Sequence, residues 1–361
     1  MSNEAEPPVK KPKINDINNF TETIDKCLQN IRQSQKNLKA VLGSEFDLPL
    51  PLVEVYVGHI TNVQDISKAI LLLNEKIPLK GLQHLKRVQR KDIILCPINY
   101  LTDVTFIQDY LEKYVPELRN VFDYFKEVQV PSLPPKVNRQ YREVKRLWPC
   151  NFHPNTYFEK LVENMMFQPH ELSVHRQYME MVFEVTRWYA VNKNIEFPLD
   201  NVFKDINTTI VVDPVIDCIV AVAFDNRQKH PMQHSAMLAI DNVAKTQDGG
   251  AWSSPDREFP GIPEEVLPYL KEKFPSVKFY VKSGKQQDND DNKEGPYLCT
   301  GYYIYMLNEP CVMCSMALVH SRAKRIFFCM DNSQNGALKS RVKLQTITSL
   351  NHRFEVFTDF F

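Results

Sequence analysis

Residues 310–322 read PCVMCSMALVHSR and open with two cysteines that are separated by two residues. Cys311 and Cys314 therefore lie three positions apart, which places both on one face of a helix. Peptide dipoles and free N–H groups at a helix start stabilise thiolates, so both side chains are predisposed to bind a metal ion. Taken alone, the pair also fits a redox couple or two thiols buried in a helix.

A second stretch, MQHSA at residues 232–236, places His234 at the start of another predicted helix. Taken alone, this residue fits an ordinary hydrogen-bonded histidine. One imidazole and two thiolates can hold three corners of a zinc tetrahedron, and the fourth corner is left for water or for a carboxylate such as the chain terminus at Phe361. The candidate Zn2+ ligands are thus His234, Cys311 and Cys314. Cys299 and Cys329 lie in or beside predicted strands and are expected to be small buried side chains.

A histidine at one helix start, then a strand, then Pro-Cys-x-x-Cys at the next helix start is the pattern of zinc nucleoside and nucleobase deaminases. Residues 147–361 resemble the cytidine deaminase superfamily and its tRNA adenosine deaminase branch. Within that branch, residues 147–153, 296–302, 309–320 and 350–354 resemble the non-catalytic subunit family of the eukaryotic heterodimeric tRNA wobble adenosine deaminase. The resemblance implies an α/β fold: a cytidine-deaminase-like three-layer α/β/α domain preceded by a smaller α+β N-terminal domain. It also implies bound zinc, tRNA as a partner, and a heterodimer with the catalytic tRNA adenosine deaminase subunit.

The same resemblance implies a glutamate two residues after the histidine, which shuttles protons to and from a zinc-polarised water. Ala236 occupies that position here. A methyl group can neither accept nor donate a proton, and general acid–base catalysis contributes roughly 10²- to 10⁴-fold to a rate. Ala236 therefore predicts no catalytic residue in this site, and the resemblance implies a subunit that supports conversion of wobble adenosine to inosine by its active partner.

Two alternative functions stay open at this point. One is an active nucleotide deaminase with an unrecognised proton shuttle, against which Ala236 argues strongly. The other is a zinc-stabilised RNA-binding or scaffold protein without a deaminase partner. Co-purification with a deaminase that carries the complete His-x-Glu motif would separate both from the favoured function. Asn226 lies near the place of a base-contacting asparagine in the branch, but we interpret it as a loop residue.

Length and composition limit the number of domains and the class of protein. The 361 residues, 43% hydrophobic, predict about two domains. Basic and acidic residues balance at 44 each, so no global charge favours nucleic acid or membrane. The sequence has no apolar run near the roughly 18 residues of a membrane span and no signal-like start, so no membrane association is expected. Eight cysteines are too sparse for a disulfide scaffold, which fits a nuclear and cytoplasmic protein.

The predicted domain organisation has four parts. A disordered basic tail covers residues 1–18, in which KKPK at residues 10–13 (Lys10 to Lys13) is a candidate nuclear-import signal or an ordinary solvated patch. An α+β domain that is expected to bind tRNA covers 19–130, and a Pro-rich, basic linker covers 131–146. The zinc domain covers 147–361 and includes an insertion at 248–296, which accounts for the long gap between His234 and Cys311.

Apolar periodicity predicts the regular elements. For the first domain it predicts helices at 20–41, 66–71 and 103–114 and strands at 52–57 and 93–98. For the second it predicts helices at 169–192, 231–245, 264–273 and 311–322 and strands at 208–212, 216–224, 301–306 and 325–330.

Two local basic clusters are candidates for binding tRNA phosphates. The first consists of Lys86, Arg87, Arg90 and Lys91, and the second of Arg139, Arg142, Lys145 and Arg146. Basic groups beside aromatic ones suit a phosphate backbone. They equally suit the solvated face of a turn or helix.

Overall fold

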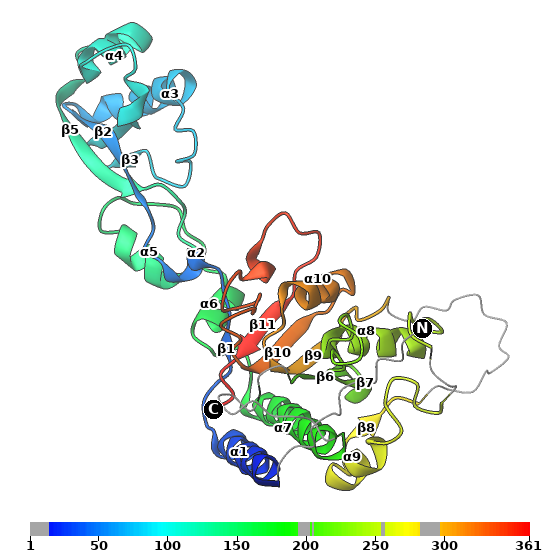
Figure 1. Ribbon diagram of the computed structural model, residues 1–361. Helices are drawn as coiled ribbons and strands as arrows, with labels where there is room; N and C mark the ends of the chain where they lie inside the picture. The colour runs from blue at the N-terminus through cyan, green and yellow to red at the C-terminus, as the bar shows by residue number, and fades with distance from the viewer. Residues whose placement is uncertain (1–13, 194–202, 204–205, 254–256, 282–296) are drawn as a thin grey trace. The chain divides into compact units, whose positions relative to one another are not determined.

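The computed structural model describes residues 14–193, 203, 206–253, 257–281 and 297–361. The described chain forms two compact units (Figure 1). The smaller unit is Gly43–Glu163, and the larger unit combines the described residues up to Leu42 with those from Asn164 onward. The predicted KKPK signal and residues 282–296 of the predicted insertion lie outside the described residues.

A seven-stranded mixed sheet forms the centre of the larger unit. Its strands are, in spatial order, β1 (Lys39–Ala40), β11 (Glu355–Thr358), β10 (Arg325–Met330), β9 (Tyr303–Asn308), β6 (Thr208–Asp213), β7 (Cys218–Phe224) and β8 (Lys278–Phe279). The pairs β11–β10, β10–β9 and β7–β8 are parallel, and the other three pairs are antiparallel. Because β6 and β7 are buried on both faces, they read as continuous apolar runs rather than as alternating ones.

Helices cover both faces of this sheet. α7 (Pro169–Asn192) and α1 (Ile14–Gln33) lie on one face, and α8 (Ser235–Thr246) and α10 (Val312–His320) lie on the other (Figure 1). A capping box between Gln168 and Glu171 satisfies free N–H groups at the start of α7. The predicted three-layer α/β/α domain is confirmed.

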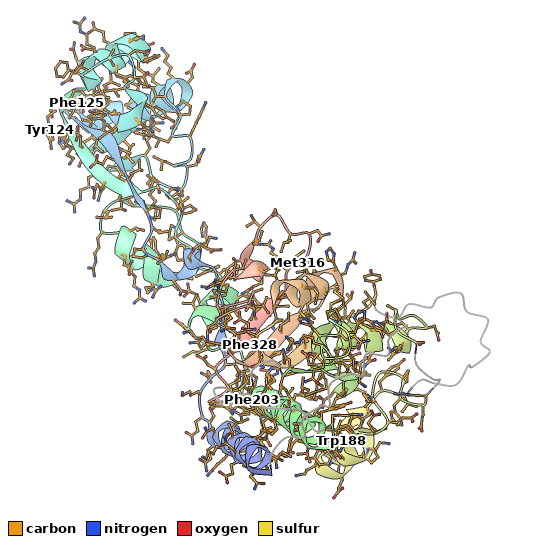
Figure 2. The ribbon with its side chains drawn as sticks, in the orientation of Figure 1. Tyr124, Phe125, Trp188, Phe203, Met316 and Phe328 are labelled. Atoms are coloured by element: carbon orange, nitrogen blue, oxygen red, sulfur yellow. The ribbon has the colours of Figure 1, made fainter. Side chains whose placement is uncertain are left out.

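The smaller unit is built on a four-stranded antiparallel sheet. Its strand order is β3 (Val88–Gln89), β4 (Asp92–Pro97), β2 (Leu52–Ile60) and β5 (Phe122–Pro131). Helices α3 (Ile66–Lys76) and α4 (Ile107–Tyr114) pack on one face in an apolar cluster with Leu95 of β4. Ile94, the neighbour of Leu95, points to the opposite face and packs in a second cluster with Trp148. Figure 2 labels Tyr124 and Phe125 on the edge strand β5.

The remaining helices are short. They are α2 (Ser44–Asp47), α5 (Asn138–Val144), α6 (Thr156–Val162) and α9 (Leu267–Lys273), with 3-10 turns at Val63–Asp65, Ile98–Tyr100, Pro116–Leu118 and Leu344–Thr346. None of the helices in the described ranges combines the length and the apolar composition needed to cross a bilayer.

The two units do not follow the predicted boundaries at 19–130, 131–146 and 147–361. β1 pairs antiparallel with β11 and α1 packs on α7, so residues 14–42 belong to the larger unit. The smaller unit is therefore inserted between β1 and α7 rather than placed before the zinc domain. Residues 14–18 are the first turn of α1 and not part of a disordered tail, because the apolar spacing of Phe20 and Ile24 extends back to Ile17.

The predicted linker at 131–146 is part of the smaller unit. It contains α5, in which Gln140 is buried and donates hydrogen bonds to the backbone carbonyls of Glu45 and Leu48. Val144, at the end of α5, packs in the same apolar cluster as Trp148. Pro131 and Pro135 are also buried, so this stretch is part of a packed fold and does not act as a spacer.

Candidate metal centre and basic surfaces

The three predicted metal ligands come together at the starts of two helices. His234 is the N-cap residue of α8, Cys311 is the N-cap residue of α10, and Cys314 is buried in the first turn of α10. One ligand atom from each side chain lies within 4.8 Å of the other two. His234 Nδ1 is 3.7 Å from Cys311 Sγ. Because β7 precedes the loop to His234 and β9 precedes Cys311, the central sheet fixes both helix starts.

The start of α10 favours a thiolate. The Cys314 thiol donates a hydrogen bond to the Cys311 sulfur, and this contact, the backbone N–H groups of Cys314 and Met313 and the nearby His234 ring lower the pKa of Cys311 to about 5. The same contact, together with burial, raises the pKa of Cys314. Cys311 is therefore poised in the ionised form in which cysteine binds a metal ion.

A cavity of about 660 Å³ opens beside these three side chains. Asp225 and Arg227 line it and form an ion pair of 2.7 Å, in which the carboxylate side chain is almost fully buried. Burial raises the pKa of Asp225, while the hydrogen bond from Arg227 opposes that shift. The volume lies in the range of small-molecule pockets. The sequence pattern gave no signal for Asp225 or Arg227 beyond their place just after a strand.

Glu309 is a site residue whose role the motif did not reveal. Its carboxylate is buried and accepts hydrogen bonds from four backbone N–H groups and one hydroxyl, supplied by Asn332, Leu338, Lys339 and Ser340. These donors belong to the segment 331–342, which forms one wall of the cavity. Glu309 thus fastens that wall to the residues that lead into Cys311.

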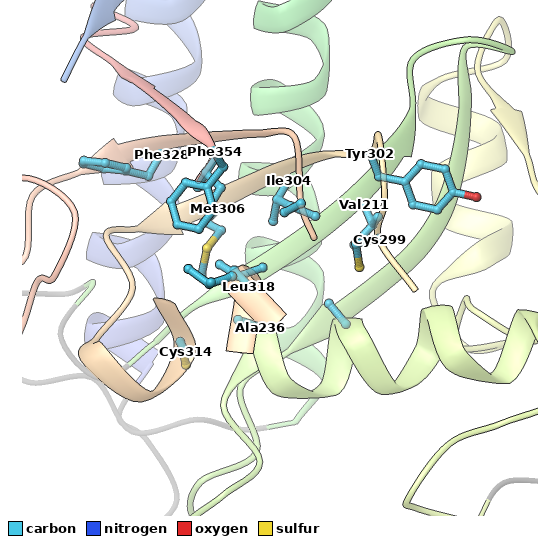
Figure 3. Close-up of a cluster of buried hydrophobic side chains, with 14 of the residues drawn as sticks. Val211, Ala236, Cys299, Tyr302, Ile304, Met306, Cys314, Leu318, Phe328 and Phe354 are labelled. Carbon is cyan, nitrogen blue, oxygen red and sulfur yellow. The ribbon is translucent and has the colours of Figure 1, made fainter. Parts of the chain in front are cut away.

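The position of the missing proton shuttle is buried. Ala236 is fully buried in the apolar core of the larger unit, in the same cluster as Cys314, Met306 and Leu318 (Figure 3). It is not among the residues that line the cavity. Ser235 beside it is buried and shares a hydrogen bond of 2.8 Å with Thr209. The methyl group at residue 236 can neither accept nor donate a proton.

The residues present fit a zinc ion. One imidazole nitrogen and two thiolate sulfurs are ligands that zinc prefers, and three protein ligands leave one position for water or another group. Phe361, considered above for that position, is not among the described residues that line the cavity. Cys299 is buried and Cys329 is partly exposed, and neither belongs to the three-residue group.

Asn226 is a loop residue, as predicted. Its backbone N–H donates to the carbonyl of Gln233 at 2.9 Å, and its side-chain amide donates to the side-chain oxygen of the same residue. Asn226 lines a second cavity of about 670 Å³, not the cavity beside the three candidate ligands. Its contacts close the loop that leads into His234.

The first basic cluster needs one correction. Lys86, Arg90 and Lys91 are exposed along the β3–β4 hairpin, but Arg87 is only 8% exposed. The Arg87 guanidinium donates to the backbone carbonyls of Ile77, Ile94 and Leu95 and to the side chain of Asn74. Arg87 therefore holds α3 to the sheet and is not available to a phosphate, so its prediction as a tRNA-binding residue is wrong.

The second basic cluster lies on and just after α5. Arg142, Lys145 and Arg146 are exposed, and the Lys145 ammonium lies 5.6 Å from the centre of the Tyr141 ring. Arg139 is exposed as well, but its guanidinium donates to the backbone carbonyls of Phe46 and Asp47 at the end of α2. Arg142 makes a long contact of 3.4 Å from its Nε to the backbone carbonyl of Asn138 in the same helix. Its side chain stays exposed, as do those of Lys145 and Arg146.

Comparisons with known proteins agree with this geometry. A family model described as the cytidine and deoxycytidylate deaminase zinc-binding region matches residues 174–330. The "Probable inactive tRNA-specific adenosine deaminase-like protein 3" of Danio rerio is 33% identical, and the match covers 88% of this chain and 89% of the relative. The human protein of the same name is 28% identical over 88% of this chain and 87% of the relative. The "tRNA-specific adenosine deaminase TAD3" of Arabidopsis thaliana is 26% identical over 85% of this chain and 91% of the relative.

The fold, the three clustered ligands and the matched family model define a domain of the cytidine deaminase class. That class includes both active and inactive members. This chain belongs to the family of TAD3 subunits and inactive tRNA-specific adenosine deaminase-like proteins 3, which it matches over most of its length.

Proposed function

We propose that this protein is the non-catalytic, zinc-binding subunit of a heterodimeric tRNA adenosine deaminase that converts wobble adenosine to inosine. The observation that carries the proposal lies at residues 234–236. His234 is brought to Cys311 and Cys314 as in a metal site, whereas Ala236 is buried in an apolar core. The chain has the ligands of a deaminase domain without the group that moves the proton.

His234, Cys311 and Cys314 would hold the zinc ion. When bound, zinc supplies a positive charge that links the starts of α8 and α10 and can polarise a water. The chain's own residues then set the surroundings: the thiolate of Cys311 balances charge, and the Asp225–Arg227 pair stays at the cavity wall. Since Ala236 offers no proton, hydrolysis of the adenine amino group is left to the partner subunit.

Exposed basic residues of the smaller unit would hold the tRNA outside the partner's site. Lys86, Arg90 and Lys91 follow one hairpin, and Arg142, Lys145 and Arg146 follow α5. Contacts of this kind position RNA through its phosphates without reading its sequence. The wobble base itself lies in an anticodon loop, where it can leave the stack more easily than in a duplex.

The deciding experiment measures inosine in a tRNA transcript that carries adenosine at the wobble position. The reaction is run with this chain alone, with a His-x-Glu-bearing deaminase subunit alone, and with both mixed. We expect inosine only from the mixture. Activity of this chain alone would show an unrecognised proton shuttle, and full activity of the other subunit alone would leave this chain as an RNA-binding or scaffold protein; either result would overturn the proposal.

The corrected first basic cluster leads to a binding prediction. The triple variant Lys86→Gln, Arg90→Gln and Lys91→Gln is expected to weaken tRNA binding about tenfold or more and to reduce the slope of log K against log salt by about 2, because three phosphate contacts are lost. Fluorescence anisotropy over a salt series measures both quantities. A matched triple variant, Lys68→Gln, Lys80→Gln and Lys113→Gln, removes the same charge from other exposed positions of this unit. Equal losses in the two variants would rule out a specific role for the hairpin.

We also propose that the protein occurs in the nucleus and the cytoplasm, with residues 10–13 as an import signal. The proposal rests on the basic composition of that segment. Unchanged nuclear entry of a fluorescent fusion that lacks these four residues would contradict that role.

A further inference from the structure

The C-terminal end of α10 has an unusual backbone. Ser321 is the C-cap residue, and Arg322 follows it with φ at +62°, in the left-handed region. The N–H of Arg322 bonds to the carbonyl of Val319, and the N–H of Ala323 bonds to the carbonyl of Leu318, which is the hydrogen-bond pattern of a Schellman motif. Glycine is preferred at the place of Arg322, since the left-handed conformation brings a Cβ too close to the following carbonyl oxygen. A non-glycine residue in this conformation is often found at a functional site, so we examined what the Arg322 side chain contacts.

The Arg322 side chain is held on an exposed aromatic ring. Its guanidinium carbon lies 5.4 Å from the centre of the Tyr297 ring, and Tyr297 is 60% exposed. The turn that carries Tyr297 is fixed to the helix end, because the N–H of Cys299 donates to the carbonyl of Ser321 at 2.9 Å. The side chain of Gln247, just after α8, holds the same turn through both backbone groups of Leu298. The ring and the guanidinium thus form a fixed pair at the surface.

Two further basic residues lie on segments joined to this helix end. The His352 ring donates a hydrogen bond of 2.8 Å from Nε2 to the carbonyl of Ala323, and the N–H of Glu355 donates to the carbonyl of Lys324 at 3.1 Å. Exposed Lys324 and exposed Arg353 are therefore carried on adjoining segments. Among residues 316–330 and 348–355 the only acidic residue is Glu355, and it is already paired with Arg325 at 2.6 Å.

We propose that Arg322, Lys324 and Arg353, with Tyr297, form a binding site for the phosphate backbone of RNA. A guanidinium already stacked on a ring loses less side-chain freedom on binding and presents its N–H fork to phosphate oxygens in the bidentate manner. An exposed tyrosine next to these cations offers a face on which a base can stack. RNA supplies both partners, the anion and the aromatic base, in one repeating unit.

This site is separate from the candidate metal centre. α10 has nine residues, so its two ends lie about 13 Å apart, and the three candidate ligands are at the opposite end from Arg322. It also belongs to the larger unit, whereas the two basic clusters discussed above belong to the smaller one. The identity of the RNA as tRNA rests on the proposed function, but the binding chemistry does not.

The test compares two double variants of the full chain, each of which removes two positive charges from exposed positions of the larger unit. Arg322→Gly with Arg353→Gln removes charge from the proposed site, and glycine suits the left-handed conformation at residue 322. Lys26→Gln with Lys278→Gln removes charge from α1 and β8. Affinity for a tRNA transcript that carries adenosine at the wobble position is measured over a salt series, and thermal unfolding is measured in parallel.

We expect the site variant to bind tRNA about tenfold more weakly with a salt slope lower by about 1.5, and the control to change by less than about twofold. The melting temperature of the site variant should be equal to that of the wild type or higher. Lys324→Gln, which leaves the helix end intact, should weaken binding severalfold and covers the case in which the double variant does not fold.

Three results would overturn the proposal. The first is equal affinity of the site and control variants, and the second is a wild-type chain that binds no tRNA even at low salt. The third is unchanged tRNA affinity with lost association to the deaminase partner, which would make the patch a protein interface. Absence of inosine from the wild-type mixture would refute the proposed function alone and would leave the measured tRNA affinities to decide this site.

Discussion

Replacing Cys314 by alanine is expected to leave the purified chain without zinc and to lower its melting temperature by roughly 10 °C. Cys314 is the buried member of the three clustered ligands, and its loss leaves only two protein ligands. Structural zinc contributes about 10–16 kcal/mol to folding in isolated zinc-finger peptides. Here α8 and α10 also share an apolar core, so we expect a smaller loss of about 3–5 kcal/mol, which corresponds to roughly 10 °C in a unit of this size. Mass spectrometry of bound metal and thermal unfolding measure the two effects.

Cys299→Ala is the matched control for this prediction. It also removes a buried thiol from the same apolar cluster, but Cys299 lies outside the ligand group. We expect that variant to keep its zinc and to lose about 1 kcal/mol of stability through the small cavity it creates. Treatment of the wild type with a strong chelator should reproduce the melting temperature of Cys314→Ala. Full zinc content in Cys314→Ala would remove Cys314 from the ligand set.

In the larger unit, the bounds of a helix or strand were predictable where a local apolar pattern alone defines that element. The apolar spacing of α7 and the apolar run of β10 give the predicted bounds 169–192 and 325–330, which the structure repeats. The metal centre was predictable in two steps: the Cys-x-x-Cys spacing places two thiols on one helix face, and the resemblance to zinc deaminases adds the distant His234 to them. The structure adds what the motif could not show, namely that residue 236 is buried in an apolar cluster and does not line the cavity.

The unit boundaries could not be predicted because they depend on distant pairings. β1 has two residues, and nothing local marks Lys39 as the partner of Thr358. β5 is the longest strand in the described chain, yet it is an edge strand exposed along most of its length, so FDYFKEVQVP carries no clear alternation. The prediction that Arg87 binds tRNA was wrong because burial, too, depends on the fold. A basic cluster looks uniformly solvated in sequence, and only the fold shows that one guanidinium is surrounded by backbone carbonyls.

Glu309 leads to the second large effect. Glu309→Ala is expected to lower the free energy of unfolding by at least about 3 kcal/mol, since four backbone N–H groups lose their acceptor and an unsatisfied buried donor costs roughly 1–3 kcal/mol. The loss should be local at first. Amide hydrogen exchange at Leu338, Lys339 and Ser340 should accelerate about 100-fold or more, because opening of the segment then requires less free energy.

Glu309→Gln separates the charge of this side chain from its shape. One oxygen of Glu309 accepts three N–H groups, and the other accepts the N–H of Asn332 and the hydroxyl of Ser340. A glutamine can keep its oxygen toward the three N–H groups and turn its amide toward the hydroxyl, so only the bond from Asn332 is lost and the cost should fall to about 1–2 kcal/mol.

Unaltered amide exchange in Glu309→Ala would show that the segment 331–342 keeps its structure without this carboxylate. The close packing argues otherwise, because a Cβ added at Gly336 would collide with Glu309, and the segment approaches the carboxylate only because glycine is there. Since the same segment bridges Gly336 to Cys311, its release in Glu309→Ala should also weaken zinc retention, whereas Glu309→Gln should retain the metal.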